Sequence, residues 1–201
     1  MTDLNRKNYS SVEQSAFSDI SASCENELQT KGFKTKVYLL RGGVGIKLLN
    51  KDHPSLASIA HLPVIEFDFA YEGEIALDHL SFFDIQGLSF SKSNFKSFSQ
   101  LEGFSLKKLH ADGTTAKDFE SLALHQLEYL SLSKTSLMSL DFLENAPIQK
   151  LYLSQTEVND QSLEVLKEKK LRALNLFKCS ISSLDPRTEN DPINVFDPIV
   201  I

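Results

Sequence analysis

The side chains that most often perform chemistry are few in this chain and lie scattered along it. The chain contains five histidines, at positions 53, 61, 79, 110 and 125, and two cysteines, at positions 24 and 179. A zinc site needs ligands at short paired spacings, and two cysteines are too few for a disulfide scaffold. No nucleophile and general base stand at matched spacings either. The sequence therefore predicts no metal site, no cofactor and no enzyme activity.

Two further patterns have a chemical interpretation that their spacing does not favour. Glu66 and Asp68 lie two residues apart, on one face of an expected strand, whereas a glycosidase needs its two carboxyl groups on opposite sides of a cleft. The segment Arg41–Lys47 is rich in glycine but lacks the GxxxxGK[ST] spacing of a phosphate-binding loop. We therefore expect a solvated acidic patch at Glu66 and Asp68, and no nucleotide site.

Composition narrows the class of protein. The 201 residues are 41% hydrophobic and 24% charged, which is typical of a globular domain with a sizeable core. The net charge of −6 argues against nucleic acid as a partner, because proteins that bind it usually carry a basic surface. No apolar run approaches the about 18 residues of a membrane span, and the N-terminus lacks the apolar segment of a secretory signal. We expect a cytoplasmic protein that binds neither membranes nor nucleic acid.

One repeated pattern organises most of the chain. The segments LEYLSLSKTSL, IQKLYLSQTEV and LRALNLFKCSI, which begin at Leu127, Ile148 and Leu171, share apolar residues at offsets 0, 3, 5 and 10 and Thr or Cys at offset 8. Further units precede them at 21-residue intervals, so that the units begin at residues 43, 64, 85, 106, 127, 148 and 171. A second apolar pair follows at offsets 13 and 16 in the first five units, and in the longer unit that begins at residue 148 it shifts to Leu163 and Leu166. Such self-similarity predicts a stack of repeated coils.

The spacing predicts how each coil folds. Residues at offsets 3 and 5 point to one side of a strand, and residues at offsets 2, 4 and 6 point to the other. One unit cannot bury its apolar side alone, but neighbours stacked about 4.8 Å apart share a continuous core. At offset 8 the chain turns inward, and we expect the small hydroxyls there to bond the backbone of adjacent units. The fifth full unit, with a helix-start signal at Asn159 or Asp160, is expected to form a short helix.

This pattern resembles the leucine-rich repeat family in its short bacterial or intracellular form, with units of about 21 residues. The resemblance covers residues 43–184. It implies an α/β solenoid: an arc with a parallel β-sheet on its concave face, few short helices on the convex side, and a helical and hairpin cap at the N-terminal end. It also implies binding to a protein partner rather than catalysis.

The two ends of such a stack need caps. Residues 11–42 are predicted to form the N-terminal cap, in which a helix ends at Gly32 and a strand pair follows around Arg41–Gly43. The expected apolar face of that helix consists of Val12, Phe17, Ile20, Cys24 and Leu28. Residues 1–10 are expected to be loose, and residues 185–201, with three Asp-Pro pairs, to form a C-terminal cap or tail.

The exposed side of the predicted sheet carries the functional signal. Tyr129, Tyr152 and Phe177 step diagonally across three successive units, and exposed aromatic residues are enriched in binding hot spots. Basic residues surround this diagonal although the whole chain is acidic. The candidate binding residues are Tyr129, Tyr152, Phe177, Lys108, Lys150, Lys134, Lys178 and His110.

We therefore expect a non-catalytic protein-interaction module, monomeric or weakly dimeric, which binds a protein partner on its concave face. Two other functions stay open: a regulatory or targeting domain associated with a kinase or hydrolase, and a binder of an acidic polymeric ligand. For the surface itself, the alternative is that its tyrosines and lysines only keep an exposed parallel sheet in solution.

Overall fold

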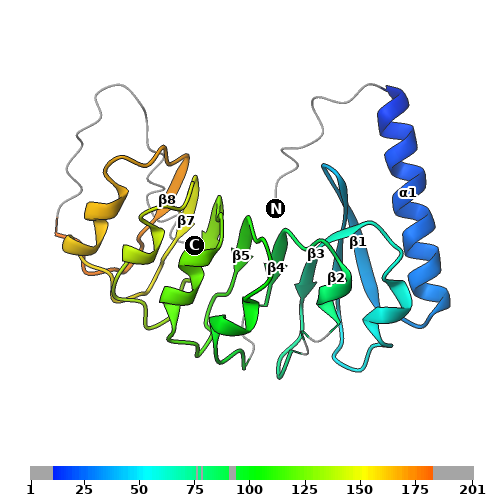
Figure 1. The fold of residues 1–201 in the computed structure, drawn as a ribbon, viewed down its shortest axis with the longest axis horizontal. Helices are drawn as coiled ribbons and strands as arrows, with labels where there is room; N and C mark the ends of the chain where they lie inside the picture. Colours follow the sequence, from blue (N-terminus) through cyan, green and yellow to red (C-terminus); the bar gives the residue numbers. More distant parts are fainter. Residues whose placement is uncertain (1–10, 76, 78, 91–93, 183–201) are drawn as a thin grey trace.

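The computed structural model describes residues 11–75, 77, 79–90 and 94–182, with side chains from residue 19 onward. Within these residues the chain is an arc of stacked coils around one eight-stranded sheet (Figure 1), whose strands follow one another in chain order. The strands are β1 (Thr35–Leu40), β2 (Gly43–Leu48), β3 (Val64–Phe69), β4 (Gly87–Ser89), β5 (Lys108–His110), β6 (Tyr129–Ser131), β7 (Lys150–Tyr152) and β8 (Ala173–Asn175). β1 and β2 are antiparallel, and each later pair is parallel.

The register of the sheet reproduces the period of the sequence. Leu109 is paired with Leu130, and Leu130 in turn with Leu151, so residues at the same offset in successive units are neighbours. The side chains of Leu130 and Leu151 are fully buried. This arrangement confirms the predicted solenoid with a parallel sheet.

The core changes composition along the stack. Every buried phenylalanine of the described residues lies at or before Phe119, whereas the later coils are filled mostly with leucine. The rings of Phe90, Phe95, Phe98 and Phe119 form a chain with centroid distances of 4.3, 5.5 and 5.5 Å between neighbours. Such contacts add to the stabilisation that burial of apolar area provides. They account for the abundance of phenylalanine in the sequence.

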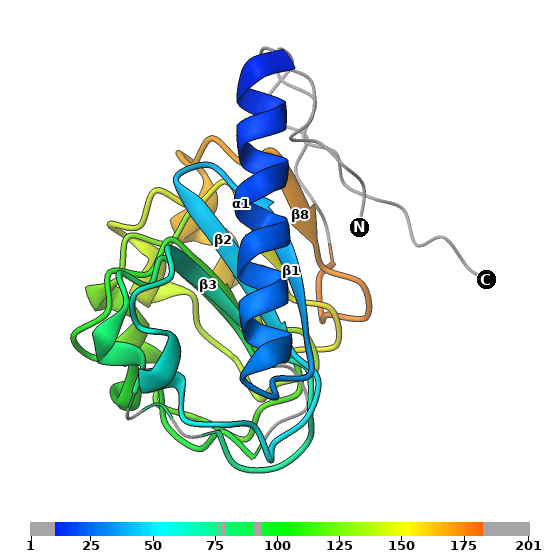
Figure 2. The ribbon, with the colours of Figure 1, turned by 90° about the vertical axis from the view of Figure 1, so that its right-hand side faces the viewer.

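The return segments are short 3₁₀ helices. They are η1 (Leu56–Ile59), η2 (Leu80–Phe82), η3 (Phe98–Leu101), η4 (Phe119–Leu124), η5 (Asp141–Leu143) and η6 (Gln161–Leu166). Figure 2 shows these turns on the side of the coils opposite the strands. The helix expected in the fifth full unit is η6, which is 3₁₀, and the Oδ1 of Asn159 accepts a hydrogen bond of 3.1 Å from the Ser162 N–H at its start.

A helix covers the N-terminal end of the stack. In Figure 2, α1 (Ser11–Thr30) runs lengthwise over β1 and β2. It ends in a Schellman motif, in which the Phe33 N–H donates to the Leu28 carbonyl and Gly32 adopts a φ of 84°. Cys24 and Leu28 are buried as expected, but the prediction for Ile20 is wrong, because its side chain is 42% exposed. The side chains of Val12 and Phe17 lie outside the described residues.

The side chains at offset 8 form hydrogen bonds at three of the turns, in a different way from the prediction, whereas the buried Thr114 hydroxyl has no hydrogen-bond partner among the described residues. Thr135 and Thr156 donate hydrogen bonds of 2.7 Å to the carbonyls of Leu132 and Leu153, which belong to their own units. Among the described residues at offset 8, only the thiol of Cys179 donates to the backbone of the preceding unit, to the Leu153 carbonyl over 3.0 Å. The expected bonds to adjacent units are therefore wrong for the two threonines.

The segments predicted at the two chain ends, residues 1–10 and 185–201, lie outside the described residues. Among the helices that the structure describes, no segment combines the length and the apolar character needed to cross a lipid bilayer.

Candidate binding face

The concave face consists of the side chains at offsets 2, 4 and 6, with the residues at offset 7 along its edge. We divide it into an N-terminal half, carried by β1–β5, and a C-terminal half, carried by β6–β8 and the turns that follow them. The candidate residues Lys108 and His110 belong to the N-terminal half, and the other six belong to the C-terminal half. The two halves share one scaffold but differ in how their polar groups are satisfied.

A buried carboxylate lies at the centre of the N-terminal half. Glu66 is 6% exposed, and its Oε1 accepts hydrogen bonds from the Tyr38 hydroxyl at 2.7 Å and from the Lys108 ammonium at 2.5 Å. A buried charge is tolerated when it is paired and hydrogen-bonded in this way. The expectation of a solvated acidic patch is therefore wrong for Glu66.

Two glycines make this arrangement possible. In the register of the sheet, Gly45 lies between Tyr38 and Glu66, and Gly87 lies between Glu66 and Lys108. A Cβ added to Gly45 would lie 2.2 Å from the Tyr38 ring, and one added to Gly87 would lie 2.8 Å from the Glu66 Oε2. Each long side chain thus crosses a strand that has no side chain at that point. Burial is also the main cause that raises the pKa of Tyr38, followed by the charge of Glu66.

The remaining acids of the N-terminal half are also paired. The Lys47 ammonium lies 2.8 Å from the Asp68 carboxylate, and His110 Nε2 lies 3.0 Å from the Asp112 carboxylate. Asp112 further accepts hydrogen bonds from the Ser131 hydroxyl and the Ser133 N–H. Burial opposes the ionisation of Asp112, but these hydrogen bonds and His110 outweigh it and lower its pKa.

In the C-terminal half, two of the predicted aromatic residues are brought together. The ring centroids of Tyr129 and Tyr152 are 5.4 Å apart, and the Lys108 ammonium lies 5.8 Å from the Tyr129 ring. Burial, and then the neighbouring Tyr152 and acids, raise the pKa of Tyr129 to about 12. Among the described residues neither tyrosine hydroxyl has a hydrogen-bond partner, so both can still bond to a ligand.

The third aromatic residue, Phe177, lies in the turn beyond β8. Its side chain is 39% exposed, and the Lys178 ammonium lies 5.3 Å from its ring. The Oδ1 of Asn175 accepts hydrogen bonds from the Phe177 N–H and the Ser154 hydroxyl, which fixes the start of this turn. No ring contact joins Phe177 to Tyr152 in the described structure, so the predicted diagonal consists of a tyrosine pair and a separate phenylalanine.

The residues at offset 7 share an unusual backbone conformation, which explains why they recur. Lys134, Gln155 and Lys178 have φ values of 60°, 59° and 60°, and Gly113 occupies the same place with a φ of 68°. Left-handed backbone costs a non-glycine residue about 1–2 kcal/mol. These positions recur at one offset because each coil makes the same turn there. Their recurrence is therefore not in itself a sign of a binding surface.

The positive charges of the lysines in the C-terminal half are nevertheless not paired with a carboxylate in the described structure. Within the described residues, Lys134, Lys150 and Lys178 form no ion pair with a carboxylate. Lys108 and His110, which we grouped with them from the sequence, are instead paired with Glu66 and Asp112. The C-terminal half therefore carries positive charge without a carboxylate partner beside a half-buried tyrosine pair and the exposed Phe177.

The histidines do not form a site. His125 is 2% exposed, donates through Nδ1 to the Phe104 carbonyl at 3.0 Å, and has its pKa lowered by burial. It is a core residue, far along the coil from His110 on the face. Among the residues that the structure describes, no three His, Cys, Asp or Glu side chains are grouped to hold a metal ion.

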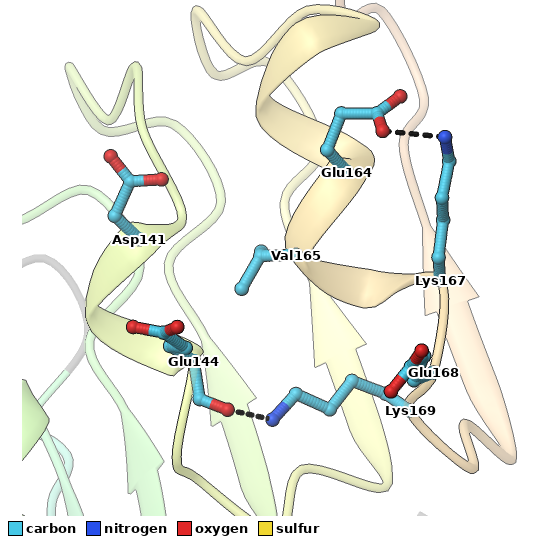
Figure 3. Close-up of a pocket in the computed structure, with 7 residues that line it drawn as sticks. All are labelled: Asp141, Glu144, Glu164, Val165, Lys167, Glu168 and Lys169. Carbon is cyan, nitrogen blue, oxygen red and sulfur yellow. Dashed lines mark hydrogen bonds and ion pairs between the residues drawn. The ribbon is translucent and has the colours of Figure 1, made fainter.

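An open hollow lies on the convex side between η5 and η6 (Figure 3). Its volume is about 660 Å³, and it is lined by Asp141, Glu144, Glu164, Val165, Lys167, Glu168 and Lys169. Lys167 is paired with Glu164, and Lys169 donates to the carbonyls of Glu144 and Ala146. Because both lysines are engaged and Val165 is the single apolar side chain, this hollow offers little to a specific ligand.

Comparison with known proteins supports the fold. No protein-family model matches the chain, and neither does any curated protein sequence. Among solved structures, an internalin (inlF) of Listeria monocytogenes is similar with a TM-score of 0.55 and 18% sequence identity. The match covers 65% of this chain and 39% of the internalin chain. At this identity the likeness concerns architecture alone, and it agrees with the leucine-rich-repeat solenoid described above.

The roles of Tyr38, Gly45 and Gly87 around the buried Glu66 were missed from the sequence. A glycine inside a strand often marks the close approach of another group, and both glycines stand at offset 2 of a strand. That signal, together with Glu66 and Lys108 at the same offset, was present in the sequence. Tyr38 lies before the first repeat, so its place depended on the antiparallel register of β1.

Proposed function

We propose that this protein is a non-catalytic protein-interaction module whose contact surface is the C-terminal half of the concave face. The observation that supports this proposal is that the two halves of the concave face differ in whether their charged side chains are paired within the fold. The acids of the N-terminal half are paired within the fold, whereas Lys134, Lys150 and Lys178 lack carboxylate partners in the described structure. Polar and charged groups left unpaired on a rigid sheet favour recognition of a complementary partner.

The partner that fits this surface is an acidic protein segment that also carries apolar or aromatic side chains. The lysines favour carboxylates, while the contacting rings of Tyr129 and Tyr152 provide a flat area that an aromatic or aliphatic side chain can cover. Tyrosine is enriched in binding hot spots because it combines a large contact area with a hydroxyl. A simple polyanion would use the charges but not the rings.

Lys108 and His110 have a different role in this proposal. The Lys108 ammonium is bound to Glu66 and lies against the Tyr129 ring, and His110 is bound to Asp112. Both residues position the boundary of the surface and do not contact the partner with a free charge.

The proposal can be tested without knowledge of the natural partner. Peptides selected from a random displayed library on the wild-type chain are expected to be acidic and to contain aromatic residues. The double variant Tyr129→Ala/Tyr152→Ala should weaken the selected peptides by at least tenfold, as measured by calorimetry. The matched control is Phe82→Ala/Leu124→Ala on the convex side, where the wild-type side chains are 57% and 71% exposed; it should leave the affinity unchanged.

A second pair of variants separates this function from binding of an acidic polymer. Lys134→Ala/Lys150→Ala/Lys178→Ala should weaken the selected peptides, whereas Lys96→Ala/Lys117→Ala/Lys170→Ala changes the net charge equally at exposed positions elsewhere and should not. Polyglutamate that binds as tightly as the peptides, with no effect of the tyrosine variant, would overturn the proposal in favour of a polyanion binder.

A further inference from the structure

The convex side of the coils carries a second exposed surface of mixed apolar and charged character. It follows the 3₁₀ helices η2 to η5, on the side of the coils opposite the strands (Figure 2). We call it the convex ridge, and its residues are Phe82, Glu102, Glu120, Leu124, Asp141 and Glu144. All six residues are exposed, the two apolar ones by 57% and 71%.

The carboxylates of the convex ridge gather at two offsets of the repeat. Glu120 and Asp141 both stand at offset 14 of successive units, and Glu102 and Glu144 both stand at offset 17. Leu124 follows at offset 18, in the unit between those of Glu102 and Glu144. Within the described residues, none of these four carboxylates forms an ion pair. Because like charges held close together repel one another, this ridge favours a basic partner.

The convex ridge complements the C-terminal half of the concave face. On that half, three lysines without a carboxylate partner in the described structure accompany the rings of Tyr129 and Tyr152, whose centroids are 5.4 Å apart. On the ridge, four carboxylates surround exposed apolar side chains. The two surfaces therefore carry opposite charge around an apolar centre, and complementarity of this kind selects a partner and fixes its orientation.

A single chain cannot bring its own two surfaces together, because they lie on opposite sides of the same coils (Figure 2). We propose that the acidic partner of the concave face is a second copy of this chain, which contributes its convex ridge. This inference rests on the proposed function above, since it names the partner of the same surface.

The residues suggest how the two copies meet. Leu124 of the second copy, the most exposed apolar side chain of the ridge, covers the flat area of Tyr129 and Tyr152, and the lysines lie against the carboxylates. Asp141 and Glu144 also line the hollow between η5 and η6 (Figure 3). That hollow is too open for a small ligand, but it leaves room for a long lysine side chain to reach the two carboxylates.

The symmetry of this contact has a consequence for assembly. The two surfaces differ, so each pair of copies leaves one concave face and one convex ridge free, and further copies can add head to tail. The net charge of −6 opposes the close approach of copies, so we expect a weak contact and an assembly that depends on concentration.

Sedimentation equilibrium of the full chain, up to about 1 mM, tests the proposal. The average mass of the wild-type chain should rise with concentration. Lys134→Ala/Lys150→Ala/Lys178→Ala on the concave face and Glu120→Gln/Asp141→Asn/Glu144→Gln on the ridge should each weaken association by at least about tenfold, because each removes one side of the contact.

A mixture of the two variants identifies the surfaces. Each variant retains the surface that the other lacks, so the mixture should form one-to-one pairs with about the affinity of the wild-type contact and should grow no further. The matched control is Asp52→Asn/Glu72→Gln/Glu74→Gln, which removes three carboxylates at exposed positions away from the ridge. It should leave association unchanged.

The possible failures are distinguishable from one another. A wild-type chain that stays monomeric at about 1 mM but binds the selected acidic peptides would overturn this inference and leave the proposed function intact. Association that the mixture of variants fails to restore would assign the contact to other surfaces and overturn the inference too. Saturating peptide should dissociate the copies, and peptide that binds without dissociating them would exclude the concave face as the site of self-association. Loss of peptide binding itself would instead overturn the proposed function.

Discussion

The two halves of the concave face are built from the same repeated coil, yet they treat charge in opposite ways. In the N-terminal half, Glu66 is buried and is held by Tyr38 and Lys108 across two glycine gaps. In the C-terminal half, larger residues replace the glycines, and in the part of the chain that the structure describes Lys134, Lys150 and Lys178 form no ion pair with a carboxylate. The comparison teaches that a column of like residues on a solenoid is not one surface: the neighbours decide which side chains are structural and which are free to bind.

The largest effect is expected when a side chain is added at one of the two glycines beside Glu66. We expect Gly45→Ala to lower the free energy of unfolding by about 2–3 kcal/mol, because its Cβ overlaps the Tyr38 ring and overpacking at a rigid contact has costs of this size. Denaturation with urea measures the effect. The same substitution in a Tyr38→Ala background should have little effect, since the ring is gone; an equal loss in both backgrounds would show that the clash is not the cause.

Substitution of one lysine from each half, Lys108 and Lys150, tests whether the two halves differ in stability. Lys108→Met removes one of two partners of the buried Glu66 and should lower the free energy of unfolding by about 1–2 kcal/mol, a value reduced by solvent around the partly exposed ammonium. Lys150→Met, at the same offset but without a carboxylate partner among the described residues, should change it by less than about 0.5 kcal/mol. Similar losses for both variants, measured under the same conditions, would contradict the division of the face.

The smallest expected effect concerns how stability depends on pH, and it tests the hydrogen bonds of Asp112. Because hydrogen bonds lower the pKa of Asp112 in the folded state, the unfolded state binds this proton more readily, and the stabilisation from Asp112 is present above its ordinary pKa of about 4 and is lost as the pH falls through the folded value. Asp112→Asn should remove this part of the acid dependence. The urea midpoint followed from pH 5 to pH 2 measures it, and an unchanged pH profile would contradict the assigned hydrogen bonds.

The sequence was sufficient for the architecture because the repeat fixes both the strand faces and their register. Leu130 and Leu151 are buried where their offsets require. The charge pairing was harder to foresee, since it depends on the reach of long side chains over Gly45 and Gly87 and on a tyrosine that precedes the first repeat. The left-handed turn at Lys134 and Lys178 was also missed, because lysine is not a residue that signals positive φ.

The packing of the α1 cap shows the same limit. A helical spacing correctly placed Cys24 and Leu28 in the core, but Ile20 is exposed. Periodicity predicts which side of a helix is apolar, whereas the extent of the surface beneath it is a property of the tertiary structure.

The most direct test of the account is an exchange footprint of a selected acidic peptide on the full chain. Hydrogen exchange with and without the peptide should show new protection in β6, β7 and the turns that contain Lys134 and Phe177, and no change in β1–β3. Protection centred on β1–β3, or on the convex turns η5 and η6, would contradict the claim that the unpaired C-terminal half of the concave face is the binding surface.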